Sequence, residues 1–184
     1  MGLHRDKTIY RLTMTAAAAA ALCVLSPWAV PLGPVPISLC TLLIYLSAWL
    51  LSPGGVVTAV AVYVLIGTAG LPVFSGFVGG LGRLVGPTGG YIVGYLPLAA
   101  ISACCARRFS ERRGMQLLGL VLGTAVLYAV GTGWFCAQMQ VGLVGGLTAC
   151  VLPFLPGDAV KIVAALLLGP VLRGRLVRSG LLYE

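Results

Sequence analysis

Six apolar segments, separated by stretches rich in proline, glycine or basic residues, dominate this chain of 184 residues and limit what it can fold into. Hydrophobic residues make up 59% of the sequence and charged residues 9%, whereas a typical soluble domain carries about 25% charge. A helix needs about 20 apolar residues to cross a bilayer, and fewer where the bilayer thins. The sequence therefore predicts an all-α integral membrane protein with a single membrane domain, residues 1–184. The six expected transmembrane helices cover approximately residues 8–26, 37–51, 56–70, 91–106, 115–135 and 158–171.

The distribution of Lys and Arg predicts the orientation of these helices. All but two of the twelve basic residues lie in the N-terminal segment, in the loop 107–113 or in the C-terminal segment. Because Lys and Arg near short loops mark the cytoplasmic side, six spans place both termini and this loop in the cytoplasm. The longer segments 27–36, 71–90 and 138–157 then lie outside. The segment 138–157 is expected to be re-entrant or to form an ordered cap on the outer face. Irregular backbone at membrane depth is tolerated only where protein or a water-filled cavity covers it. We expect a multi-pass protein of the cell membrane.

Asp158, Lys161 and Arg83 are the charges that stand alone in the apolar body of the chain. Insertion scales give a cost of about 2.5–3.5 kcal/mol for such a group at membrane depth, and it usually lines a pathway or site. Asp158 and Lys161 are three residues apart and share a helix face. Together with Arg83 they carry one net positive charge, which one ligand carboxylate would neutralise. Alternatively, Asp158 only caps its helix, Lys161 reaches the interface, and Arg83 is an exposed loop charge.

Other chemistry finds little support in the sequence. The six cysteines lack metal-site spacing and the single histidine is His4, so we expect no metal. The string Gly79-Gly80-Leu81-Gly82 lacks the phosphate-loop pattern. General acid–base catalysis needs more polar groups than the apolar body offers, so we expect neither an enzyme nor a cofactor. The basic residues flank apolar segments instead of covering one face, which argues against nucleic acid. Two readings stay open beside a ligand-binding membrane protein: a proton-coupled carrier of a small anion that uses Asp158, and an assembly scaffold.

Two further groups of residues allow both a structural and a functional interpretation. Phe74, Phe77 and Tyr91 flank the glycine-rich segment; they either anchor the chain at the membrane interface or wall an apolar pocket. The unbroken alanine run 16–21 brings small residues four apart onto one helix face. Such faces allow close approach of helices, either within this chain or with a partner membrane protein.

Three strings in the sequence resemble the BioY family, the biotin-specific substrate-binding (S) components of energy-coupling factor (ECF) transporters. They are Gly70-Leu71-Pro72-Val73-Phe74-Ser75-Gly76-Phe77, Gly86-Pro87-Thr88-Gly89-Gly90-Tyr91 and Pro156-Gly157-Asp158-Ala159-Val160-Lys161. The resemblance covers nearly the whole chain. It implies six helices, biotin held near the outer face, and docking of the first helix on a transmembrane coupling subunit that carries two ATPase subunits. The ligand-contacting positions that it suggests are Asp158, Lys161, Arg83, Phe74, Ser75, Phe77, Thr88, Gly90, Tyr91 and Cys40, and the docking positions are Ala16, Ala17, Ala20 and Ala21.

The second-helix string, Ser38-Leu39-Cys40-Thr41, departs from the expected family pattern, in which many relatives carry Gln. If Cys40 occupies that position, a polar contact is lost or moved. Biotin has one carboxylate, an uncharged ureido head and an apolar body. Asp158 could accept from the ureido N–H groups, while Lys161 or Arg83 could face an oxygen of either end, so the ligand's direction stays open. An S component for another small vitamin is the nearest alternative function.

Overall fold

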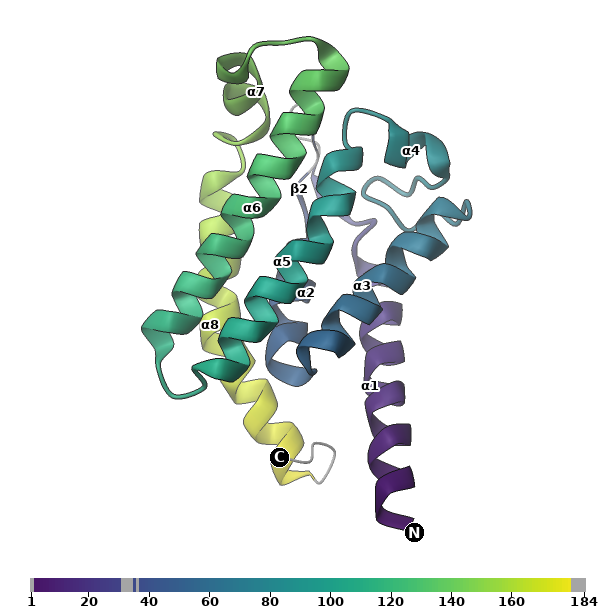
Figure 1. Ribbon diagram of the computed structural model, residues 1–184, viewed down its shortest axis with the longest axis vertical. Helices are drawn as coiled ribbons and strands as arrows, with labels where there is room; N and C mark the ends of the chain where they lie inside the picture. The colour runs from purple at the N-terminus through teal and green to yellow at the C-terminus, as the bar shows by residue number, and fades with distance from the viewer. Residues whose placement is uncertain (1, 31–34, 36, 180–184) are drawn as a thin grey trace.

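Figure 1 shows a bundle of helices in a computed structural model that describes all residues except 1, 31–34, 36 and 180–184; the side chains of 2–7, 30 and 37 are likewise not described. Within the described residues the elements are α1 (Gly2–Leu25), β1 (Ala29–Val30), β2 (Ile37–Ser38), α2 (Cys40–Leu50), α3 (Pro53–Thr68), α4 (Leu81–Val85), α5 (Gly89–Arg108), α6 (Arg113–Met139), α7 (Leu143–Cys150) and α8 (Leu155–Arg178).

Four helices in the described part of the chain are long and apolar enough to cross a membrane. These spans are Thr8–Leu25 of α1 and the whole of α5, α6 and α8. The apolar helices α2 and α3 are shorter, with 11 and 16 residues. The chain is thus a multi-pass membrane protein, and the regular structure of its described residues is helical apart from one pair of two-residue strands.

The structure differs from the expected segments in three places. The second helix begins at Cys40 and not near residue 37, because Ile37–Ser38 pairs antiparallel with Ala29–Val30. The segments 71–90 and 138–157 each contain a short helix, α4 and α7. Finally, α8 continues past residue 171 to Arg178, with Pro170 inside it. A proline removes one backbone hydrogen bond, which neighbouring groups can compensate within a membrane helix.

Glycines allow α5 and α6 to pack as the most extensive helix pair of the bundle. A Cβ atom at Gly90 would overlap Trp134, and one at Gly131 would overlap the ring of Tyr91. Such small residues let membrane helices approach closely, and dispersion contacts between the helices then stabilise the pair. The start of α5, where several of the predicted site residues lie, is therefore held firmly against α6.

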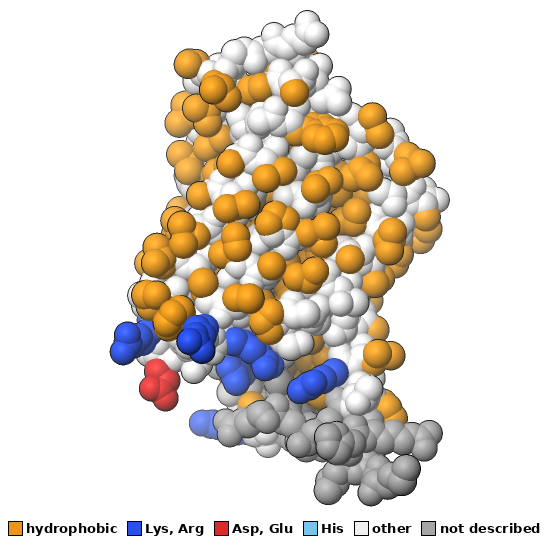
Figure 2. Space-filling model, in the orientation of Figure 1, with side chains coloured by type: hydrophobic (Ala, Val, Ile, Leu, Met, Phe, Trp, Pro, Cys, Tyr) orange, Lys and Arg blue, Asp and Glu red, His pale blue; other side chains and the backbone are white. Residues whose placement is uncertain are grey.

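The bundle has two chemically different ends. Both described chain ends and the loop after α5 lie at one end, whereas α4, α7 and the starts of α5 and α8 lie at the other (Figure 1). Figure 2 shows the Lys and Arg side chains as a band at the first end, below a surface that is mostly apolar. At 1.5 Å rise per residue, Asp158 lies about 22 Å along α8 from Arg173. We call these the basic end and the cavity end.

Candidate ligand-binding site

An ion pair in the first turns of α8 is the polar centre of the cavity end. The Nζ atom of Lys161 donates to Oδ1 of Asp158 at 3.0 Å, and the side chains are 12% and 10% exposed. Helical spacing of three residues brings the two onto one face. It is the one salt bridge among the described residues. The two isolated charges of the sequence thus neutralise each other inside the protein.

Two hydroxyl groups from other helices complete the environment of this pair. Thr41 of α2 donates its hydroxyl to Oδ1 of Asp158 at 3.5 Å and accepts from Nζ of Lys161 at 3.1 Å. Tyr128 of α6 donates its hydroxyl to the other carboxylate oxygen, Oδ2. Since hydrogen bonds to a charged group are about twice as strong as neutral ones, the carboxylate is fixed between three helices. Three of its roughly four lone-pair sites are occupied, which leaves one on Oδ2 for a ligand.

Beside the ion pair lies a cavity with two lobes. The polar lobe, which holds the ion pair, has a volume of about 40 Å³. The second lobe, also of about 40 Å³, lies towards α4. Val35, Tyr91 and Tyr95 line both lobes, so the two are adjoining parts of one elongated cavity. Small-ligand sites combine apolar walls with a few polar groups, and the lining of this cavity has that composition. The free space in it is much smaller than the roughly 300–1,000 Å³ of such sites, so a ligand of that size requires its walls to separate.

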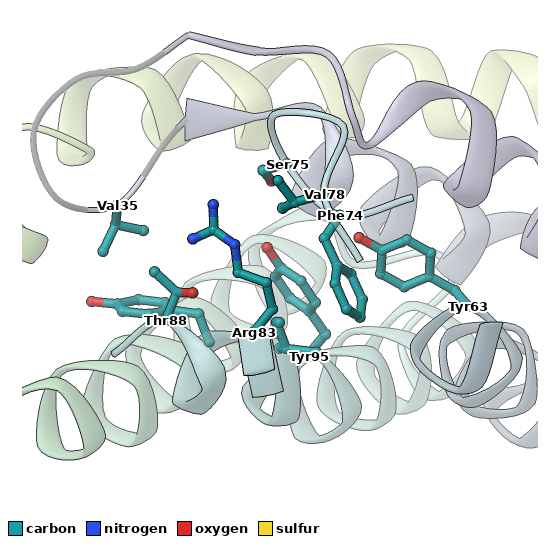
Figure 3. Close-up of a pocket in the computed structure, with 10 residues that line it drawn as sticks. Val35, Tyr63, Phe74, Ser75, Val78, Arg83, Thr88 and Tyr95 are labelled. Carbon is teal, nitrogen blue, oxygen red and sulfur yellow. The ribbon is translucent and has the colours of Figure 1, made fainter. Parts of the chain in front are cut away.

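The second lobe carries one cation, Arg83. Figure 3 shows its guanidinium in the space between Val35 and Ser75, above the ring of Tyr95. None of the described carboxylates forms an ion pair with this guanidinium. Because Asp158 and Lys161 are neutral together, the cavity as a whole carries the charge of Arg83. An elongated ligand with one anionic end matches this distribution.

Aromatic residues shape the walls. The ring of Phe74 is 3% exposed and meets Tyr63 edge to face, with ring centroids 5.6 Å apart. The hydroxyl of Tyr91 lies 3.0 Å from Oγ1 of Thr132 and donates to the backbone oxygen of Cys150 at 3.2 Å. These bonds connect the start of α5 to α6 and to the end of α7, so the cap formed by 138–157 is tied to the cavity wall.

The structure brings most of the predicted contact residues to the cavity. Those that line it are Asp158, Lys161, Arg83, Phe74, Ser75, Thr88 and Tyr91. Three others, Phe77, Gly90 and Cys40, lie outside the cavity. Phe77 is 56% exposed and packs on the edge of Trp28, with ring centroids 5.5 Å apart. Gly90 is covered by Trp134. Phe77 and Gly90 therefore have structural roles.

Cys40 is fully buried behind the cavity and lies next to the hydroxyl groups of Tyr63 and Tyr95. Two other residues of the same string, Ser38 and Thr41, are among those that line the polar lobe. Within this string it is Thr41, one position after Cys40, that bonds the ion pair.

Sequence reasoning missed several residues that line the cavity. Tyr128, Tyr95, Thr41 and Ser38 contribute hydroxyl groups, while Val35, Tyr63, Val78, Ile92, Leu127 and Phe154 complete the walls. A hydroxyl-bearing residue inside an apolar helix is a weak signal that could have drawn attention to Tyr128. Its partner, Asp158, lies 30 residues away, and only the packing of α6 against α8 brings the two together.

The alanine run of α1 borders a second, apolar hollow of about 260 Å³ between α1, α2 and α8. Ala17 and Ala21 line it, together with Leu43, Leu46 and Leu172 among others. Ala16 and Ala20 are exposed on α1 outside the hollow. Only 11% of the apolar span of α1 is buried, compared with 61% for α5, so much of this helix is open to lipid or to a partner.

Comparisons with known proteins identify the family of this chain. A model of the BioY family matches residues 4–178. This chain belongs to the BioY family. It is 38% identical over 150 residues to the biotin transporter BioY of Thermotoga maritima, covering 80% of this chain and 87% of the relative. It is 32% identical over 165 residues to the biotin transporter BioY2 of Lactococcus lactis subsp. cremoris, covering 89% and 88%.

A solved structure shares the fold of this BioY-family chain. It is the crystal structure of the S-component for biotin from an ECF-type ABC transporter, which superposes with a TM-score of 0.85 at 26% identity and covers 92% of this chain and 93% of that one. The predicted family is therefore confirmed. Among the described residues of this member, no group of three His, Cys, Asp or Glu side chains could hold a metal ion.

Proposed function

We propose that this BioY-family chain is the biotin-binding S component of an ECF-type vitamin importer. The observation that carries the proposal is the elongated cavity with the Asp158–Lys161 pair in one lobe and the unpaired Arg83 in the other. Biotin has the matching distribution of groups, with an uncharged ureido ring, an apolar body and a single carboxylate. The relatives named above as biotin transporters, and the structural neighbour, support the choice of ligand.

The charges of the site support one direction for the ligand. Lys161 is already neutralised by Asp158, whereas Arg83 has no such partner among the described carboxylates. We therefore assign the biotin carboxylate to Arg83, whose planar donors suit a carboxylate. A ureido N–H group then faces Asp158, and the ureido oxygen accepts from the remaining proton of the Lys161 ammonium. The other contacts that we propose come from Phe74, Ser75, Thr88 and Tyr91 in the wall, and from Thr41 in place of Cys40.

We further propose six transmembrane spans within one domain, with both termini on the cytoplasmic side of the cell membrane. The four long spans leave α2 and α3 as the two additional crossings, which tightly packed shorter helices can make where the bilayer is thinned. The band of Lys and Arg at one end (Figure 2) supports a cytoplasmic basic end by the positive-inside rule. The cavity end then faces outward, where biotin would be captured.

Binding of biotin by this chain includes no chemical reaction that could release energy. Import therefore needs an energy source in partner subunits. We propose a transmembrane coupling subunit with two ATPase subunits, as expected for an ECF transporter. The face of α1 around Ala17 and Ala21 is the docking surface that we assign, because the residues are small and the neighbouring hollow is apolar. An Ala17→Leu substitution should weaken co-purification with the coupling subunit and leave biotin binding by the isolated chain unchanged.

A titration of the purified chain with biotin tests the proposed function. We expect saturable one-to-one binding without ATP, and none with riboflavin or thiamine at the same concentrations. Binding of one of those vitamins in place of biotin would assign the cavity to another ligand. Uptake of biotin by this chain alone in sealed vesicles, abolished by a proton uncoupler, would instead support a proton-coupled carrier that uses Asp158.

A further inference from the structure

A third hollow lies at the basic end, far from the proposed biotin cavity. It measures about 560 Å³, is widely open, and forms where α5 ends beside the start of α3. The residues that line it are Pro53, Cys104, Cys105, Arg107, Arg108 and Phe109. Its walls thus combine apolar groups with two cations, which is the composition expected for a site that takes an amphiphilic anion.

Two further cations act on this hollow in addition to the two arginines in its lining. Arg11 of α1 and Arg173 of α8 lie close enough to Arg107 to repel it electrostatically. Among the side chains that the structure describes, none of these arginines forms an ion pair with a carboxylate. Arg107 and Arg108 suit the negative C-terminal end of their own helix, but Arg11 and Arg173 come from other helices. Cations from three helices thus gather near this hollow, and together they would attract an external anion.

The start of α3 adds a further attraction for an anion. Pro53 is the first residue of this helix of 16 residues, and Ser52 accepts a hydrogen bond from the backbone N–H of Gly55. The space around Gly54 is open, since no atom lies within 4 Å of a Cβ built there. A helix start presents the positive end of the helix dipole, and Pro53 in the lining places that end at the hollow.

We propose that this hollow binds the phosphate group of an anionic phospholipid. Figure 2 shows a band of Lys and Arg side chains directly below the apolar surface of the bundle. We place this boundary where headgroups meet the hydrocarbon of a bilayer. A lipid there would place its phosphate among Arg107, Arg108, Arg11 and Arg173, with its glycerol and first acyl carbons against Cys104 and Phe109. Basic pockets between membrane helices are known to bind such headgroups. Free phosphate shares the charge, but it would leave the apolar walls uncovered.

A pair of matched double variants tests this site. Arg107→Gln with Arg108→Gln removes the lining cations, whereas Arg112→Gln with Arg113→Gln removes the same charge from exposed positions outside the lining. Each protein is purified in a neutral detergent, and its thermal unfolding is followed as phosphatidylglycerol or phosphatidylcholine is added to the micelles. Inorganic phosphate at the same phosphorus concentration forms a third arm. Biotin titration of each variant verifies that the protein is folded.

We expect phosphatidylglycerol to raise the unfolding temperature saturably in the unmodified protein and in the Arg112/Arg113 variant. The lipid fraction needed for half of this effect should rise at least tenfold in the Arg107/Arg108 variant, and phosphatidylcholine should have little effect on any of the three. An equal loss in both variants would mean nonspecific surface charge and would overturn the site. The same saturable shift with inorganic phosphate would assign the hollow to a free anion. Stabilisation that arises only on adding a coupling subunit would assign it to a partner protein.

Discussion

Removing the Asp158–Lys161 pair one residue at a time should separate ligand binding from protein stability. The changes are Lys161→Met, Asp158→Asn and the two together. In the structure the two side chains are about a tenth exposed and 3.0 Å apart, and Thr41 and Tyr128 also donate to the carboxylate. Either single change leaves one charged group inside the protein without its opposite charge, while the double change leaves a neutral pair of similar volume.

The expected magnitudes follow from this burial. Breaking a buried ion pair costs about 3–5 kcal/mol of stability, and the remaining donors and partial exposure favour the lower figure of about 3 kcal/mol. For a chain of this size that corresponds to a fall of about 6–12 °C in unfolding temperature. The double variant should recover most of this loss, since neutral replacements of buried pairs are often tolerated.

Biotin affinity should behave differently. Losing one partner of a buried pair at a binding site costs about 2–5 kcal/mol, or roughly a 30- to 5,000-fold increase in Kd. The double variant should stay as weak as the single variants, because it lacks both the carboxylate that accepts from the ligand and the ammonium that donates to it.

Calorimetric titration with biotin and thermal unfolding in the same detergent measure the two quantities on the same samples. Arg112→Gln, in the exposed loop at the basic end, is the control and should match the unmodified protein in both. A double variant that binds biotin within threefold of the unmodified protein would refute the reasoning, whatever its stability.

Three further changes test other parts of the account. Arg83→Gln should weaken biotin at least tenfold and leave a biotin amide, which lacks the carboxylate, nearly unaffected in parallel titrations; equal losses for both ligands would contradict the assigned direction. Tyr128→Phe removes a hydrogen bond from Tyr128 to the Asp158 carboxylate, worth about 1.5–3 kcal/mol, so the unfolding temperature should fall by about 3–12 °C. Gly90→Ala forces a Cβ atom into Trp134, so the unfolding temperature of this variant should fall. The control Gly114→Ala places its Cβ atom in open space and should leave the unfolding temperature unchanged or slightly higher. Equal effects of the two changes would argue against close packing of α5 on α6.

The sequence predicted the parts of the site that depend on charge. Asp158 and Lys161 stood out because ionisable groups are costly in an apolar chain, and their spacing alone indicated a shared helix face. Arg83 was found in the same way. The glycine-rich strings also located the start of α5 and the wall residues Phe74 and Tyr91.

The sequence could not predict which side chains converge from distant helices. Tyr128 and Thr41 reach Asp158 only because α6, α2 and α8 pack around one point. Gly90 and Phe77 lie in the correct strings, yet helix packing and the contact with Trp28 place them outside the cavity. The helix bounds differed for a similar reason, since the strand pair that delays the start of α2 forms between residues on either side of a loop.

A structure of the protein with bound biotin tests the central claim most directly. Our account predicts ligand density along the two-lobed cavity, with the carboxylate within hydrogen-bonding distance of Arg83 and the ureido ring beside Asp158 and Lys161. Density at another place, such as the apolar hollow beside α1, or an empty cavity at saturating biotin, would contradict it.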